Sequence, residues 1–182
     1  YFDIEGLRAE KIEHFNQAGD LVTSETYRYD SNGYESEHTD INGLITRYTR
    51  DHTGRELTRI ERADTSDARI ITTSYYGVTS QPAVITTPET RTNIYYTTHD
   101  SGLLVTQQTI TDLATNQARS TTFTYNGAGL VTSVDGPRID IGDVSVFEYN
   151  AQGLKTKTTN ALGQTTTVTA FNSFGKPTSI ID

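Results

Sequence analysis

Four histidines are the first side chains in this sequence that could do chemistry, because imidazole nitrogens bind transition metals. A zinc site needs three or four ligands that converge at about 2 Å, usually with two of them close in sequence. The histidines are instead far apart, at His14, His38, His52 and His99. His52 and His99 also lie in or beside expected turns. We therefore expect no metal site and no cofactor.

Acidic side chains are the second candidates. Residues 30–33, Asp-Ser-Asn-Gly, resemble the start of a calcium-binding loop, but the alternating acidic ligands and the closing Glu are absent. A carboxylate pair at glycosidase spacing could arise across strands by chance. The chain has no Cys, and it lacks the Gly-x-Ser-x-Gly, His-Glu-x-x-His and phosphate-loop motifs. We therefore expect that the protein is not an enzyme, and a β-scaffold hydrolase is the least favoured alternative.

Most of these acidic and amide residues belong to a repeated pattern, Asp or Asn followed three places later by Gly. An aromatic residue often precedes it, and an apolar, Thr-rich run follows it. A repeat on this scale determines the architecture. The structural turn residues of the nine copies are Asp3 and Gly6, Asn16 and Gly19, Asp30 and Gly33, Asp40 and Gly43, Asp51 and Gly54, Asn126 and Gly129, Asn150 and Gly153, Asn160 and Gly163, and Asn172 and Gly175.

Each copy is typical of a β-hairpin turn. A type I turn favours Asp or Asn at its first position, where the side chain accepts hydrogen bonds from backbone N–H groups ahead, and Gly at its fourth. When that fourth residue has positive φ, the outgoing strand regains the right-handed twist of the sheet. We therefore predict positive φ at Gly33, Gly129 and Gly153.

The segments between the turns are rich in Thr, Val, Ile and Tyr, which suits a half-buried pleated surface. Gly33, Gly43 and Gly54 are 10 and 11 residues apart, which leaves strands of roughly six to eight residues. Successive turns then lie at alternate ends of the strands, and an antiparallel meander results. Residues 7–15 contain enough helix formers to suggest a helix, but their position between two turns predicts a strand.

We expect one continuous repeat array over residues 1–182, cut from a longer protein. Regular copies occupy residues 1–62 and 122–182. The middle, residues 63–121, is degenerate, with breaks near Pro82 and Pro88 and a worn copy at residues 98–103. Strand composition persists there over residues 69–76, 84–86, 94–97 and 104–110, whereas residues 112–117 and 136–137 predict loops.

Composition limits the partners and the core. The formal charge of −8 and the pI near 4.9 argue against nucleic acid, which requires concentrated Lys and Arg. No apolar run approaches the roughly 18 residues that span a bilayer, so we expect no membrane insertion. Only 34% of residues are hydrophobic and the mean hydropathy is −0.54, which predicts no compact two-layer core.

The pattern resembles the YD-repeat proteins, also called RHS-repeat proteins, most clearly at residues 29–33, 125–130 and 149–154. That family includes bacterial polymorphic toxins, shell subunits of insecticidal toxin complexes, and teneurins. The resemblance implies an all-β strip that winds into a hollow shell, often around a C-terminal toxin. The family's Asp-Pro-x-Gly-Leu self-cleavage motif is absent, since Asp135-Gly136-Pro137 has the wrong order, so no self-cleavage is expected.

We therefore expect a curved antiparallel strip, or part of a hollow β-shell, from a secreted or cell-surface protein, which encloses or presents a toxin or effector domain. Its expected partners are neighbouring YD repeats of the same or an identical chain, and an enclosed toxin domain. The alternative is an extracellular adhesin or fibre module that binds glycans or proteins through an exposed Tyr and Thr face.

Overall fold

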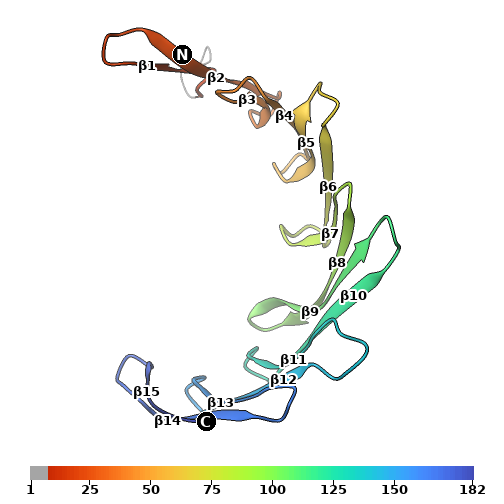
Figure 1. Cartoon of the computed structure of the whole chain (residues 1–182), viewed down its shortest axis with the longest axis vertical. Coiled ribbons are helices and arrows are strands. Elements are labelled where there is room, and N and C mark those ends of the chain that lie inside the picture. Colours follow the sequence, from red (N-terminus) through yellow and green to blue (C-terminus); the bar gives the residue numbers. More distant parts are fainter. Residues whose placement is uncertain (1–7) are drawn as a thin grey trace. The chain divides into compact units, whose positions relative to one another are not determined.

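A computed structural model describes residues 8–182 of the chain, and this part contains strands and no helix. It is shown in Figure 1. The strands are β1 (Lys11–Phe15), β2 (Leu21–Tyr29), β3 (Glu35–Thr39), β4 (Ile45–Arg50), β5 (Glu56–Ala63), β6 (Arg69–Tyr75), β7 (Pro82–Thr86), β8 (Thr90–His99), β9 (Gly102–Asp112), β10 (Ala118–Tyr125), β11 (Val131–Asp135), β12 (Val144–Tyr149), β13 (Lys155–Thr159), β14 (Thr165–Phe171) and β15 (Pro177–Ile181).

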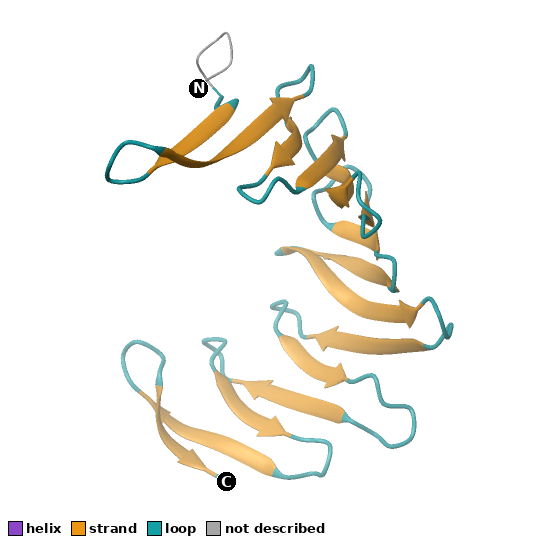
Figure 2. Cartoon of the chain, turned by 45° about the horizontal axis from the view of Figure 1, so that its top comes forward, coloured by secondary structure: helices purple, strands orange, loops and turns teal. Residues whose placement is uncertain are grey.

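The strands follow sequence order in the sheet, and neighbouring strands run antiparallel. This confirms the predicted all-β antiparallel meander, and the hairpins can be followed in Figure 2. Two compact units divide the chain, Tyr1–Arg91 and Thr92–Asp182, with the boundary inside β8. No described segment is a helix long and apolar enough to cross a membrane.

The strands differ from the sequence-based expectations mainly in their ends. The segment predicted as a strand before the second turn forms β1 from Lys11 onward, so the helical alternative is wrong over its described part. Strand lengths range from 5 residues in β1 to 11 in β9, which is wider than predicted. The break expected near Pro82 is the loop at residues 76–81, and Pro82 itself begins β7, because proline is tolerated at the first position of a strand.

Cross-strand pairs in unit 1 bring side chains of neighbouring strands together on one face of the sheet. On one face Tyr27 lies opposite His38, and their rings stack at 4.6 Å with an interplanar angle of 8°. Threonines form a row on a single face of β5, β6 and β7, where Thr58 pairs with Thr72 and Thr72 pairs with Thr86. Side chains alternate between the two faces along a strand, so each of these aligned pairs places its side chains together on one face.

The sheet has almost no interior. Of the described residues, only Ala63 and Ile71 are buried, at 3% and 7% exposure. This confirms the expectation that the composition does not support a compact core. Stability therefore comes from ladder hydrogen bonds and from contacts between neighbouring strands and turns, as in other repeat architectures.

Candidate functional site

The repeated turns share one hydrogen-bond geometry, seen clearly at Asp30. The Asp30 carbonyl accepts from Gly33 N–H at 2.9 Å, and Asp30 N–H donates to the Tyr34 carbonyl at 2.8 Å. The Asp30 carboxylate oxygen Oδ1 accepts from Asn32 N–H at 2.8 Å and from Tyr34 N–H at 2.9 Å. These bonds define a three-residue hairpin loop, a type I turn followed by a residue in the left-handed region.

The same four bonds recur in every described copy of the repeat. The turn glycines all have positive φ, between 72° and 86°, and this includes Gly33, Gly129 and Gly153, where it was predicted. Asp3 and Gly6 lie outside the described residues. The other turns begin at Asn16, Asp40, Asp51, Asn126, Asn150, Asn160 and Asn172.

Turns on one edge of the sheet are stacked, and we call this the packed edge. It comprises the turns that contain Gly33, Gly54, Gly129, Gly153 and Gly175, together with residues 76–81 between β6 and β7 and residues 100–101 between β8 and β9. At Gly54, Gly153 and Gly175 the side chain that directly follows one repeat turn covers the glycine of the next repeat turn along that edge, whereas Arg8 covers Gly33, and Ser101 and His99 cover Gly129. A Cβ on Gly54 would lie 2.6 Å from the Tyr34 ring, and a Cβ on Gly175 would lie 3.1 Å from Leu154.

The opposite edge, which we call the open edge, has no such stacking. It comprises the turns at Gly19, Gly43 and Gly163 and the loops 64–68, 87–89, 113–117 and 136–143. A Cβ at Gly19, Gly43 or Gly163 would meet nothing within 4 Å. Gly54 and Gly175 are therefore required for two reasons, positive φ and space, whereas Gly19, Gly43 and Gly163 are required for φ alone.

Tyrosines just before the packed-edge turns reinforce the ladder ends. The Tyr149 hydroxyl donates to the Val131 carbonyl at 2.7 Å, and the Tyr125 hydroxyl donates to the Val105 carbonyl at 2.6 Å. Tyr29 and Tyr75 make the same bond to the preceding strand segment, at Ala9 and Glu56. Burial raises the pKa of the Tyr75 and Tyr125 hydroxyls. These hydroxyls therefore act as hydrogen-bond donors to backbone carbonyls of the sheet.

We predict that Tyr149→Phe lowers the free energy of unfolding by about 1 kcal/mol, because the Val131 carbonyl loses its side-chain donor. Urea unfolding followed by circular dichroism measures this change. Tyr95→Phe is the matched control, since Tyr95 is 52% exposed and its hydroxyl makes none of these bonds. Equal effects of the two substitutions would contradict the role of the tyrosine hydroxyl.

Polar side chains also join successive packed-edge turns. The Arg55 guanidinium donates to the Gly77 carbonyl at 3.3 Å and also to the Thr79 carbonyl, and it lies 4.8 Å from the Tyr75 ring centroid. His99 Nε2 lies 3.2 Å from the Gly127 carbonyl oxygen. Each contact links a turn to the next turn on the same edge, so hydrogen bonds as well as van der Waals contacts join neighbouring packed-edge turns within each unit.

The structure brings two of the four histidines together on Glu25. His14 Nε2 lies 3.4 Å from Glu25 Oε1 and His38 Nε2 lies 3.2 Å from Oε2, while the Tyr27 hydroxyl donates to Oε2 at 2.7 Å. The hydrogen bond to Glu25 raises the pKa of Tyr27 to about 12. Hydrogen bonds from Tyr27 and His38 lower the pKa of Glu25.

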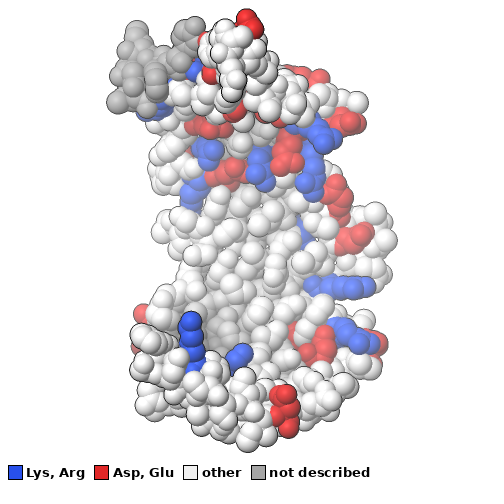
Figure 3. Space-filling model, turned by 60° about the vertical axis from the view of Figure 1, so that its left-hand side comes forward, with Lys and Arg blue, Asp and Glu red and all other residues white. Residues whose placement is uncertain are grey.

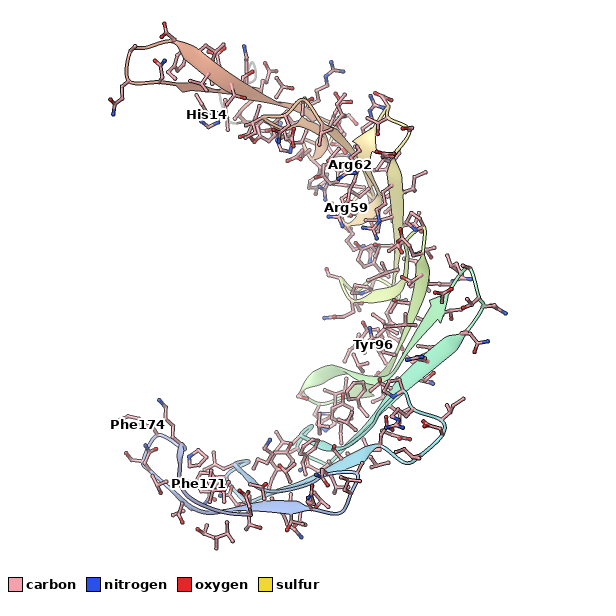
Figure 4. All side chains as sticks on the ribbon, viewed as in Figure 1. His14, Arg59, Arg62, Tyr96, Phe171 and Phe174 are labelled. Carbon is pink, nitrogen blue, oxygen red and sulfur yellow. The ribbon has the colours of Figure 1, made fainter. Side chains whose placement is uncertain are left out.

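No group of three metal-ligating side chains with suitable geometry occurs in residues 8–182. His14 lies on β1, away from the labelled Arg59 and Arg62 of the same unit (Figure 4). His52 is exposed in its turn, and His99 contacts Ser101 at 2.8 Å. The sequence could not have revealed the pairing of His14 with Glu25, because that contact depends on the register of β1 against β2.

Ion pairs concentrate in unit 1, where Figure 3 shows acidic and basic side chains intermixed. Arg47 is the centre of one network, with Glu37 Oε2 at 2.7 Å from Nε and both Asp64 oxygens at 2.6 and 2.7 Å from the other guanidinium nitrogens. Arg62 and Asp64 have positive φ, 51° and 66°, which is uncommon for residues other than Gly. The two Arg47–Asp64 bonds hold this irregular end of β5 against β4.

These features define a class: an antiparallel β-meander built from repeated Asp or Asn turns with one packed edge. Solved structures of TcdB2-TccC3 share this fold, with a TM-score of 0.60 and 12% identity over 98% of this chain and 11% of that chain. The TcdB2-TccC3-Cdc42 structure gives a TM-score of 0.59 and 12% identity over 97% of this chain and 11% of that one.

TcdB2-TccC3 without its hypervariable C-terminal region matches at a TM-score of 0.59 and 12% identity, over 89% of this chain and 10% of that chain. At such identity the similarity concerns the fold. This chain spans about a tenth of the length of those chains. No protein-family model matches the sequence, and no curated protein matches it.

Proposed function

We propose that this chain is a structural, non-catalytic segment of an RHS/YD-type shell that encloses or presents a toxin or effector domain. The observation that carries the proposal is the fold match to TcdB2-TccC3, which covers 98% of this chain and a small share of that much longer chain. In this proposal the parent protein is secreted or delivered to a cell surface, and the segment supplies part of its wall.

The packing suits a wall that is one sheet thick. A sheet with only two buried residues in its described part cannot derive its stability from a central core. It instead relies on each repeat contacting its neighbours, which the stacked turns and the tyrosine hydroxyl bonds provide. Such a structure can be extended repeat by repeat without a change in its thickness.

Neighbouring repeats are the partners that this proposal requires. Among the described strands, β15 pairs with β14 and has no strand on its other side. A strand edge with unpaired N–H and C=O groups favours the addition of another strand. In the proposed wall, that strand belongs to a further YD repeat of the same or an identical chain.

Limited proteolysis of the parent protein tests enclosure directly. The chain is expressed with its natural flanking sequence, and the flanking domains are followed by mass spectrometry during digestion, with electron cryomicroscopy of the same sample. We expect a hollow particle and a flanking domain that resists protease until the wall is unfolded. A flanking domain that is cleaved as fast as its isolated form, on an extended particle without a cavity, would contradict the proposal and favour a fibre or adhesin.

The glycan-binding alternative draws less support from the geometry. It requires tyrosine rings that are exposed for stacking on sugars, whereas Tyr29, Tyr75, Tyr125 and Tyr149 are half-buried and held in place by hydroxyl bonds to backbone carbonyls. We therefore propose that these tyrosines stabilise the sheet.

A further inference from the structure

A cavity of about 360 Å³ lies on the open edge of unit 2, at the start of β10. Its lining comes from two segments, residues 117–119 at the start of β10 and residues 137–140 of the loop between β11 and β12. Figure 2 shows that this loop leaves the end of β11 on the same side of the unit as the loop before β10. The volume is within the range of about 300 to 1,000 Å³ that is usual for ligand sites.

The backbone of β10 is unpaired along this cavity. β11 pairs with β10 only as far as Thr122, opposite Asp135, so residues 118–121 extend beyond the end of β11. Those residues pair with β9 on their other side, where Ala118 lies opposite Thr111 and Thr121 lies opposite Gln108. The cavity therefore lies along a short free edge of a strand whose opposite edge is held in the sheet.

The direction of the free backbone groups follows from the neighbouring hairpin. Asn126 directs its N–H to Leu130 and its C=O to Gly129, toward β11. Alternate residues of a strand direct these groups to the same side. The extra residue at the register irregularity belongs to β11, so the alternation along β10 is unbroken. Ala118 and Ser120 therefore direct N–H and C=O groups to the β11 side, and no described backbone group bonds to them there.

One of the two cations in the cavity lining has no ion-pair partner among the described residues. The Arg119 side chain is exposed and makes no ion pair or hydrogen bond within the part of the chain that the structure describes. The second cation, Arg138, is neutralised by Asp140, with guanidinium–carboxylate distances of 2.7 and 3.1 Å. Beside these charges lies Ile139, which is 98% exposed. The lining thus offers one free guanidinium, one apolar side chain and a strand edge.

We propose that this cavity binds an extended peptide segment that carries a carboxylate. The peptide adds as a short strand beside residues 118–120, where its backbone pairs with Ala118 and Ser120. Its acidic side chain accepts hydrogen bonds from Arg119, and an adjacent apolar side chain packs on Ile139. Strand addition of this kind takes affinity from backbone bonds and specificity from alternate side chains, and a guanidinium–carboxylate contact supplies strong charge-assisted hydrogen bonds.

Titration of the ¹⁵N-labelled chain with the capped peptide acetyl-Thr-Val-Asp-Val-Thr-amide tests this site by NMR. We expect saturable shifts of the Ala118 and Ser120 amide signals. A peptide with Asn in place of Asp should bind about tenfold more weakly, because a charge-assisted bond is lost. A peptide N-methylated at alternate amides should produce no saturable shift, because it cannot pair with a strand edge.

Arg119→Gln is the matching protein variant, and Arg91→Gln, which removes the same charge from exposed Arg91 outside the cavity, is its control. We expect Arg119→Gln to bind the Asp and Asn peptides equally weakly, and Arg91→Gln to behave as the original chain. Three results would overturn the proposal. The Arg119→Gln variant could still prefer the Asp peptide over the Asn peptide, the amide signals that shift could all belong to other strands, or the shifts could fail to saturate at millimolar peptide. A uronic acid oligosaccharide that shifts the same amides when peptides do not would also overturn it.

Discussion

Gly54→Ala should destabilise the chain more than Gly43→Ala, although both glycines have positive φ and both close the same type of turn. At Gly43 the cost is that of a left-handed Ala, about 1 kcal/mol. At Gly54 the new Cβ would lie 2.6 Å from the Tyr34 ring, and such overpacking adds about 1 to 3 kcal/mol. Urea unfolding of both variants, followed by circular dichroism, measures the difference.

The double variant Tyr34→Ala with Gly54→Ala separates the steric cost from the backbone cost. Removing the ring should make the Gly54→Ala substitution about as costly as Gly43→Ala, so the two substitutions should couple. If Gly54→Ala costs the same with and without the Tyr34 ring, the stacked turns do not contribute to stability as inferred.

As the pH falls, unit 1 should lose protection from hydrogen exchange before the part of unit 2 whose turns begin with Asn. The Asp40 carboxylate accepts hydrogen bonds from Leu44 N–H and Asn42 N–H, and its pKa is lowered, chiefly by Leu44. The pKa of Asp51 is lowered by bonds from Thr53 and Arg55, and that of Asp64 by Arg47. The corresponding turns of β12 to β15 begin with Asn150, Asn160 and Asn172, whose amide oxygens do not titrate.

The lowered pKa values of these carboxyls determine how the stability of unit 1 changes with pH. A carboxyl whose pKa is lower in the folded state stabilises the fold above its unfolded pKa, near 3.9 for Asp, and this stabilisation is lost as the pH falls below that value. Hydrogen exchange, corrected for intrinsic rates, should therefore show protection in β3 to β5 falling about tenfold or more between pH 6 and pH 3, with less than about a threefold change in β13 to β15.

Exchanging the turn residues provides a reciprocal control. Asp51→Asn should reduce the acid sensitivity of β4 and β5, because the amide oxygen still accepts the backbone bonds but cannot be protonated in this range. Asn150→Asp should introduce acid sensitivity near β12 and β13. Equal loss of protection in both regions, unaffected by these exchanges, would show that the turn carboxylates do not determine the acid response.

The hairpins could be predicted from the sequence because their determinants are local. The Asp or Asn side chain binds N–H groups two and four residues ahead, and the left-handed glycine belongs to the same turn. Antiparallel pairing then follows from turns of fixed length. The predictions were weaker at strand ends in the middle of the chain, where no repeat marks the turns between β5 and β10.

Contacts between turns could not be predicted in the same way. Tyr34 covers Gly54 and Leu154 covers Gly175 only because two intervening strands bring alternate turns to one edge. The cavity beside Arg119 likewise depends on β11 being shorter than β10, which the composition of residues 126–143 does not reveal. The pairing of His14 and His38 with Glu25 depends on strand register for the same reason.

The difference between the two edges determines where the chain can accept changes of length. Residues added to the open-edge loops, such as 64–68 or 136–143, displace no stacked side chain, and surface loops tolerate such additions. A single residue added within β3 or β4 would shift the strand register that brings the Tyr34 ring to Gly54. The open-edge loops can therefore vary in length, whereas the strands that lead to the packed-edge turns keep the length that their contacts require.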